Sequence, residues 1–139
     1  MVSESGNSGD RLRDAAFAAM ENAYAPYSRF RVGAAIKASS GEIVAGCNVE
    51  NAAYGEALCA ERVAVAAAVA QGLTTFEEIA IASESDEPSP PCGSCRQTMS
   101  EFAPDLLIRS YARNGKQATW HLSELLPEAF ALNHLRGRT

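Results

Sequence analysis

Three cysteines and one glutamate stand where their side chains could form a metal site. Cys59 begins the segment Cys-Ala-Glu-Arg, and Cys92 and Cys95 belong to the segment Pro-Cys-Gly-Ser-Cys. Zinc prefers sulfur and nitrogen ligands in a tetrahedral array, and a catalytic site uses three protein ligands and leaves the fourth position to water. Glu61, two residues after Cys59, places a carboxylate beside the metal without making it a ligand. This spacing predicts a zinc site that activates a water molecule.

Both cysteine segments are expected at the starts of helices. Unpaired N–H groups and the positive end of the helix dipole lower the pKa of a thiol there and favour the thiolate that binds metal. A Cys-x-Glu element followed by Pro-Cys-x-x-Cys is the pattern of zinc nucleobase deaminases, in which the glutamate carries protons. Three thiolates leave the metal centre with excess negative charge, so we expect the guanidinium of Arg62 to hydrogen-bond a thiolate and offset it.

Two other kinds of site use the same cysteines. Cys47 could be a fourth ligand and close the site into a structural zinc module, and Cys92 with Cys95 could form a redox-active dithiol. A closed structural zinc site would give Glu61 no role, and a redox dithiol would leave both Cys59 and Glu61 unexplained. We therefore favour the open catalytic site and expect Cys47 to be a small buried hydrophobe.

Composition limits the classes of partner and of compartment. The chain has 139 residues, of which 47% are hydrophobic and 21% charged, which fits one soluble domain over residues 1–139. Its net charge of -5 argues against nucleic acid as a partner and favours a small or neutral substrate. No apolar run is long enough for a membrane span. Residues 1–9 resemble a disordered tail rather than a signal peptide, and the cytosol is the expected compartment.

The hydrophobic pattern predicts the elements that must position these residues. A helix over residues 11–23, with Asp10 as its N-cap and Pro26 beyond its end, precedes a hairpin of strands over 30–38 and 42–49. An Ala-rich helix over 57–70 follows and should stop at Gly72. Its small side chains would let it pack closely against another backbone.

The second half of the chain adds the remaining elements. We expect a strand over 76–82, a loop over 83–91 and a helix over 93–102. Two strands should follow, over 106–108 and 118–120, around a turn at Asn114-Gly115. A last helix should begin at Ser123 and contain Leu125, Leu126 and Phe130. This order of helices and strands predicts an α/β fold in which a mixed sheet carries helices on both faces.

Taken together, six segments resemble the small, homotetrameric cytidine deaminases. The match runs from about Asp10 to Phe130 and rests on residues 24–28, 30–35, 46–51, 59–62, 91–97 and 124–127. The resemblance implies a three-layer α/β/α sandwich with a mixed five-stranded sheet. It also implies one Zn²⁺ per subunit and the hydrolytic deamination of cytidine and 2′-deoxycytidine to the uridine forms with release of ammonia, as part of pyrimidine salvage.

The same resemblance assigns roles to single residues. Cys59, Cys92 and Cys95 correspond to the zinc ligands, and Glu61 corresponds to the proton shuttle. Asn48 and Glu50 correspond to the contacts with the ribose hydroxyls, and neutral sugar hydroxyls do suit an amide and a carboxylate. Other implied substrate contacts are Phe30, which packs on the pyrimidine, and Ala60. Tyr54 and Phe130 are assigned to sites shared between neighbouring subunits. Independently of the resemblance, we expect Arg62 and Gln97 to support the metal ligands.

One departure from the family pattern concerns Glu56-Ala57-Leu58, because family members carry mostly uncharged residues before the first cysteine. A charge at Glu56 would lie near the pocket rim or at a subunit contact, while the chemistry stays intact. The alternative function within the enzyme class is deamination of a modified cytosine nucleoside, such as a nucleoside antibiotic.

Overall fold

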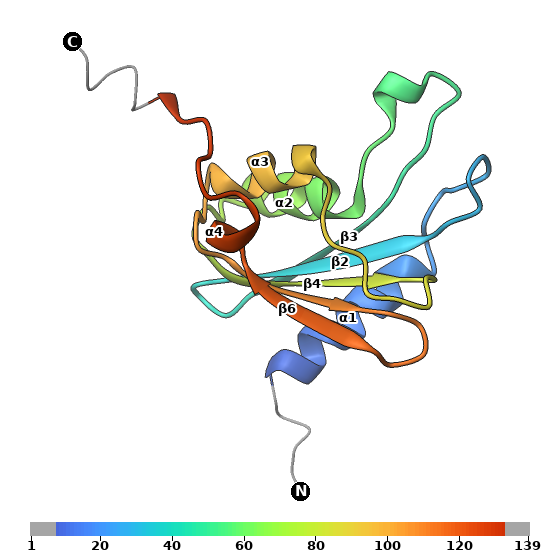
Figure 1. Cartoon of the computed structure of the whole chain (residues 1–139), viewed down its shortest axis with the longest axis horizontal. Coiled ribbons are helices and arrows are strands. Elements are labelled where there is room, and N and C mark those ends of the chain that lie inside the picture. The colour runs from blue at the N-terminus through green and yellow to red at the C-terminus, as the bar shows by residue number, and fades with distance from the viewer. Residues whose placement is uncertain (1–7, 133–139) are drawn as a thin grey trace, which may run out of the picture.

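A computed structural model describes residues 8–132 as a five-stranded mixed sheet between two layers of helices. The strand order is β3-β2-β4-β5-β6. Helix α1 covers one face of the sheet, and helices α2 and α3 cover the other (Figure 1). The predicted three-layer α/β/α architecture is therefore confirmed. No helix within residues 8–132 is both long enough and apolar enough to cross a membrane.

The sheet combines two hairpins with one parallel pair. Strand β2 pairs antiparallel with both β3 and β4, β4 runs parallel to β5, and β5 pairs antiparallel with β6. The parallel pair requires a crossover, which α3 supplies. The elements are α1 (Ser8–Met20), β2 (Val32–Ala38), β3 (Ile43–Cys47), the 3₁₀ turn η1 (Tyr54–Glu56), α2 (Ala60–Ala70), β4 (Phe76–Ser83), α3 (Gly93–Ser100), β5 (Leu107–Tyr111), β6 (Gln117–His121) and α4 (Leu122–Leu125).

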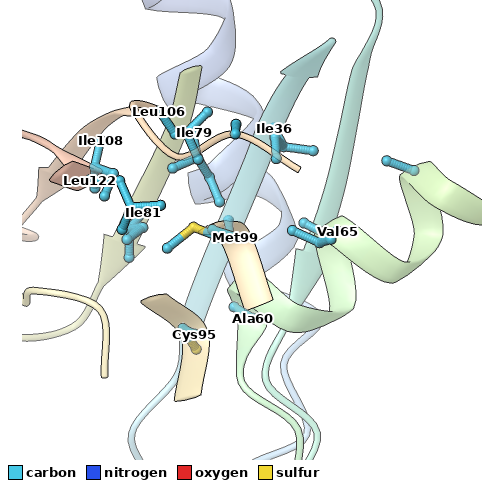
Figure 2. Close-up of a cluster of buried hydrophobic side chains, with 14 of the residues drawn as sticks. Ile36, Ala60, Val65, Ile79, Ile81, Cys95, Met99, Leu106, Ile108 and Leu122 are labelled. Atoms are coloured by element: carbon cyan, nitrogen blue, oxygen red, sulfur yellow. The ribbon is translucent and has the colours of Figure 1, made fainter. Parts of the chain in front are cut away.

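Each face of the sheet has its own apolar cluster. The cluster under α1 is built mostly of alanines with Leu12 and Met20, and the larger cluster lies under α2, α3 and α4. In the larger cluster Met99 of α3 and Val65 of α2 point toward the isoleucines of β2, β4 and β5 (Figure 2). Cys95 belongs to this cluster and is fully buried. One of the three predicted thiols therefore projects from the core itself.

Glycines let both helical layers approach the sheet closely. A Cβ on Gly46 of β3 would lie 2.6 Å from the backbone nitrogen of Ala64 and 2.9 Å from the carbonyl oxygen of Ala60, both in α2. On the opposite face, a Cβ on Gly33 would lie 2.0 Å from the carbonyl oxygen of Ala16 in α1. The expected close approach of the Ala-rich helix to another backbone is thus confirmed, and it fixes the start of α2 against β3.

The ends of the first two helices differ from their predicted positions. Helix α1 begins at Ser8, so Asp10 lies in its first turn and is not the N-cap, and it ends at Met20, before Pro26. Residues 1–7 of the expected tail lie outside the described residues, whereas Ser8 and Gly9, also predicted to belong to it, lie in α1. Helix α2 begins at Ala60 instead of residue 57. Its predicted end at Gly72 is confirmed.

Backbone hydrogen bonds explain both ends of α2. Before the helix, Leu58 pairs with Val49 in an isolated β-bridge, which keeps the chain extended. After the helix, Gly72 has a φ of 85°, and its N–H donates to the carbonyl of Val69 at 2.9 Å. The N–H of Leu73 donates to the carbonyl of Ala68 at 3.0 Å. These two bonds form the glycine-ended C-cap known as the Schellman motif.

The last helix is shorter than predicted. Helix α4 is a single turn capped by His121, whose N–H donates to Glu124 Oε1 at 2.7 Å. Ser123 is not the cap, because its hydroxyl donates to Asp105 Oδ1 at 2.6 Å. Phe130 consequently lies beyond the helix in an irregular C-terminal segment.

Candidate active site

The three predicted thiols lie together at the N-terminal ends of α2 and α3. Cys59 and Cys92 are the N-cap residues of these helices, and Cys95 lies in the first turn of α3. The Sγ of Cys92 is 4.0 Å from that of Cys59 and 3.5 Å from that of Cys95, and all three Sγ atoms lie within 4.8 Å of one another. Among the described residues, Cys47 of β3 is not a member of this cluster.

The donor set and its geometry fit zinc. A Zn–S bond of about 2.3 Å in a tetrahedral site separates neighbouring sulfurs by about 3.8 Å. The two measured separations lie close to this value, and the thiols supply three ligands, as an open catalytic site requires. Cys92 is exposed while Cys95 is buried, so the cluster extends from the core to the surface. These cysteines could hold the metal and leave one position free.

The thiols differ in how readily they ionise without metal. The pKa of Cys59 is lowered to about 6, first by a hydrogen bond with Cys95, then by one with Cys92 and by the positive charge of Arg62. The pKa of Cys95 is raised by its hydrogen bond with Cys59 and by burial. Cys59 therefore gives up its proton more easily than Cys95 does.

Glu61 is the second residue of α2 and is only 6% exposed. Burial raises its pKa to about 7, and the negative charge of Cys59 adds to this effect. Its own backbone N–H, a hydrogen bond with Cys95 and the charge of Arg62 act in the opposite direction. A carboxyl group with a pKa near neutrality can both accept and donate a proton at pH 7.

Arg62 connects the two helix starts. Its Nη1 donates to Ser94 Oγ in the first turn of α3 at 3.4 Å. Its charge also favours the ionised forms of Cys59 and Glu61. The expected hydrogen bond from Arg62 to a thiolate stays a prediction. The positive charge of Arg62 nevertheless lowers the pKa values of Cys59 and Glu61.

A three-stranded backbone contact brings the predicted sugar contacts beside the first thiol. Val49 forms a parallel bridge with Tyr24 and an antiparallel bridge with Leu58, the residue before Cys59. The N–H of Glu50 donates to the carbonyl of Tyr24 at 2.8 Å, and the N–H of Leu58 donates to that of Val49 at 2.8 Å. Segments that are distant in the sequence thus meet next to the start of α2.

Asn48 and Glu50 hold the loop that precedes β2. Asn48 Oδ1 accepts from the N–H of Val32 at 2.9 Å, and its Nδ2 donates to the carbonyl of Phe30 at 2.9 Å. Glu50 Oε1 accepts from the N–H groups of Tyr27 and Ser28 at 3.0 and 3.1 Å. These bonds also explain why β2 begins at Val32, since the carbonyl of Phe30 is bonded to a side chain.

Ser28 completes the hydrogen bonding of Glu50, and its hydroxyl donates to Glu50 Oε2. This bond is the main reason why the pKa of Glu50 lies below its usual value. The carboxylate borders an open hollow of about 350 Å³, large enough for part of a small ligand. The lining residues are Tyr27, Ser28, Glu50, Asn51, Tyr54 and Ala57.

Three further predicted substrate contacts differ in exposure. Phe30 is 38% exposed and Tyr54 is 83% exposed, so both rings are open to a ligand or to another chain. Ala60 is 1% exposed and belongs to the core cluster, which leaves its backbone as the part that could touch a substrate. Their roles remain predictions.

Helix α3 also holds the C-terminal segment. Gln97 Nε2 donates to the carbonyl of Phe130 at 2.9 Å. Arg96 Nε donates to the carbonyl of Pro91 at 2.8 Å, and its Nη1 donates to that of Leu125 at 3.0 Å. Sequence analysis missed Arg96, although it belongs to the segment that carries the resemblance, because its partners lie up to 29 residues away. Arg96 ties the residue before Cys92 to the end of α4.

Comparison with known proteins agrees with this geometry. The family model for the cytidine and deoxycytidylate deaminase zinc-binding region matches residues 7–110. The chain belongs to this zinc-binding deaminase family. It is 44% identical over 116 residues to the cytidine deaminase of Halalkalibacterium halodurans, covering 83% of this chain and 88% of that one.

Solved structures of the family share the fold. The crystal structure of cytidine deaminase from Burkholderia pseudomallei matches with a TM-score of 0.84 and 45% identity, covering 87% of this chain and 98% of that one. A more distant relative is the blasticidin-S deaminase of Bacillus cereus, 32% identical over 114 residues, or 76% of this chain and 81% of that one. The chain is an enzyme of the deaminase class, as its sequence predicts.

Proposed function

We propose that this chain hydrolytically deaminates cytidine and 2′-deoxycytidine to uridine and 2′-deoxyuridine, releases ammonia and serves pyrimidine salvage in the cytoplasm. The observation that carries this proposal is the buried Glu61 beside a cluster of three thiols that fits zinc. The similarity to cytidine deaminases over most of the chain supports the same substrate class.

Cys59, Cys92 and Cys95 are the proposed ligands of one Zn²⁺ per subunit. Zinc supplies a water molecule of lowered pKa, which is the nucleophile the reaction needs at neutral pH. Glu61 would accept one proton of the attacking water and deliver it to N3 of the pyrimidine while the water oxygen bonds to C4. It would then move the remaining proton from the new C4 hydroxyl to the amine, so that the C4–N bond breaks, the C4 carbonyl forms and ammonia leaves. Its raised pKa suits both directions of transfer, and its burial keeps bulk water from competing for the proton.

The residues around the hollow select a nucleoside. Glu50 presents an ionised carboxylate to a sugar hydroxyl. Asn48, the second proposed sugar contact, also fixes the backbone around Phe30, the proposed platform for the base. The lining of the hollow holds one carboxylate and no basic side chain, which disfavours a 5′-phosphate and therefore a nucleotide. Arg62 and Gln97 support the metal ligands and the C-terminal segment, respectively.

Neighbouring copies are proposed to complete each site in a homotetramer. Tyr54 and Phe130 carry this part of the proposal, because their side chains are 83% and 65% exposed in the single chain. Aromatic residues are enriched in protein–protein interfaces relative to the rest of the surface. Neither nucleic acid nor a membrane is part of the proposal.

The decisive experiment is an absorbance assay of the zinc-loaded protein with cytidine, 2′-deoxycytidine, their 5′-monophosphates and blasticidin S. We expect turnover of the two nucleosides and little turnover of the phosphorylated forms. A protein that leaves both nucleosides unchanged but deaminates the antibiotic would replace the proposal with the second candidate function, which the similarity to blasticidin-S deaminase favours.

A further inference from the structure

Ser28 hydrogen-bonds both Glu50 and the backbone of Phe30, the residues proposed to contact the sugar and the base. Its hydroxyl donates to Glu50 Oε2 and accepts from the backbone N–H of Phe30 at 3.0 Å. A serine hydroxyl has a single proton, so the bond from Phe30 orients that proton toward the carboxylate. Ser28 therefore has a defined donor direction although its side chain is exposed.

The loop backbone is shaped to allow this arrangement. Arg29, between Ser28 and Phe30, has a φ of 58°, which non-glycine residues adopt at a conformational cost of about 1–3 kcal/mol. Its N–H donates to the carbonyl of Ala25 at 3.0 Å, which closes the turn. Strain of this kind persists where the surrounding contacts require it, and here those contacts converge on Glu50.

The hydrogen bonds of Glu50 leave little room for further donors. An ionised carboxylate offers about four acceptor positions. The N–H groups of Tyr27 and Ser28 occupy two of them, and the hydroxyl of Ser28 occupies a third. About one acceptor position of the Glu50 carboxylate therefore remains, and Glu50 lines the hollow.

We infer that Ser28 is a positioning residue, which holds Glu50 so that its one remaining acceptor position receives a single sugar hydroxyl of the substrate. This inference rests on the proposed function, because it assumes a nucleoside in the hollow. It explains how one pocket can accept both cytidine and 2′-deoxycytidine: a carboxylate with room for one hydroxyl does not need to contact the other.

The test measures Ser28→Ala with cytidine and with 2′,3′-dideoxycytidine, which lacks both ring hydroxyls. We expect kcat/KM for cytidine to fall about tenfold, mainly through a higher KM, because hydrogen bonds to charged groups contribute on this order. For the dideoxy substrate the change should stay within about twofold, since that substrate has no hydroxyl for Glu50. Ser28→Thr keeps the hydroxyl and should restore most of the activity with cytidine.

The matched control is Ser40→Ala. Ser40 also donates to a glutamate, Glu42 Oε1, at 3.0 Å, but it lies in the turn between β2 and β3. This variant should leave the kinetic constants for both substrates unchanged. Combined with Glu50→Gln, Ser28→Ala should cost little beyond the single change, because the two residues act as a unit.

The outcomes separate this inference from the proposed function. A wild-type protein that is inactive on every cytosine nucleoside overturns the proposed function and this inference with it. An active wild type whose Ser28→Ala variant keeps its activity with cytidine overturns the inference alone. The inference is also wrong if the variant loses equal activity with both substrates, since Ser28 would then act on the loop or on Phe30 and not through the sugar.

Discussion

Two glutamates of the site differ in their properties because their surroundings differ. Glu61 and Glu50 are both glutamates, yet burial raises the pKa of Glu61 to about 7, whereas hydrogen bonds from Ser28 lower the pKa of Glu50. The first carboxyl can therefore exchange protons near neutral pH, and the second stays charged and binds hydroxyl groups. Environment alone separates a proton carrier from a recognition group.

This difference leads to a prediction for Glu61→Gln. The amide keeps the size of the side chain but cannot carry protons, so kcat should fall by at least about 10²–10⁴-fold. Zinc content, measured by atomic absorption, should not change, because Glu61 is not a proposed ligand. Glu101→Gln at the exposed end of α3 is the control and should keep full activity. Near-normal turnover of a zinc-loaded Glu61→Gln protein would refute the assignment.

A second residue-scale prediction concerns pH. Glu84 accepts from the backbone N–H and from the guanidinium of Arg31, at 2.8–3.0 Å, and these bonds lower its pKa from the usual 4.5. A carboxyl group with a lowered folded-state pKa adds stability above its unfolded pKa and loses it as the pH falls through the folded value. The contribution should therefore be complete above pH 4.5 and disappear in more acidic solution.

The measurement compares thermal unfolding midpoints of the wild type and Glu84→Gln. The variant should unfold at a lower temperature at pH 7, and the two midpoints should converge as the pH falls well below 4.5. Glu87→Gln removes a more exposed ion pair with Lys116 and should change the midpoint less at pH 7. A Glu84→Gln deficit that keeps its size as the pH falls would show that the pair does not act through its charge.

At the scale of elements, helix α2 holds the site because it lies directly against the sheet. Gly46 permits this, since any larger residue would place a Cβ 2.6 Å from the backbone of Ala64. Two residues of the site, Cys59 and Glu61, stand at the end of α2 that Gly46 contacts. Displacement of this helix by a few tenths of an ångström would change the separation of the thiols.

We therefore predict that Gly46→Ala both destabilises the fold and weakens zinc binding. Overpacking of this kind costs about 1–3 kcal/mol, which urea unfolding measures. Competition with a chelator should show a faster loss of zinc than from the wild type. Gly55→Ala is the control, because a Cβ there meets nothing within 4 Å. Unchanged stability and zinc affinity in Gly46→Ala would mean that α2 can shift without affecting the site.

The elements also show what sequence could and could not predict. The order of helices and strands and the three thiols with Glu61 followed from local pattern, because each depends on residues a few positions apart. The hydrogen bonds that Ser28 and Arg96 form could not be predicted in this way, because their partners Glu50 and Leu125 are 22 and 29 residues away. The start of α2 was misplaced for the same reason, because Leu58 pairs with Val49, a contact that no local pattern encodes.

On the scale of the whole molecule, two projecting parts carry the two most exposed aromatic rings of the described residues, Tyr54 and Phe130. The loop that contains η1 and the C-terminal segment both rise on the side of the sheet covered by α2 and α3 (Figure 1). Tyr54 shares the hollow with Glu50 of its own chain, whereas Phe130 is held over α3 by Gln97. If neighbouring copies share sites, Phe130 should serve a site other than that of its own chain.

Mixed oligomers test this prediction. Glu61→Gln and Phe130→Ala subunits should each be nearly inactive alone when the sites are shared. After unfolding and refolding as an equal mixture, a site works if its own chain keeps Glu61 and its neighbour keeps Phe130, so about a quarter of the wild-type activity should return. Light scattering establishes the oligomeric state of each preparation.

A mixture that is no more active than its separate components would place Phe130 in the site of its own chain or outside any site. Mixing these two variants is informative because Glu61 is buried and Phe130 is exposed. Loss of the Phe130 side chain should therefore leave the zinc ligands and Glu61 of its own chain intact.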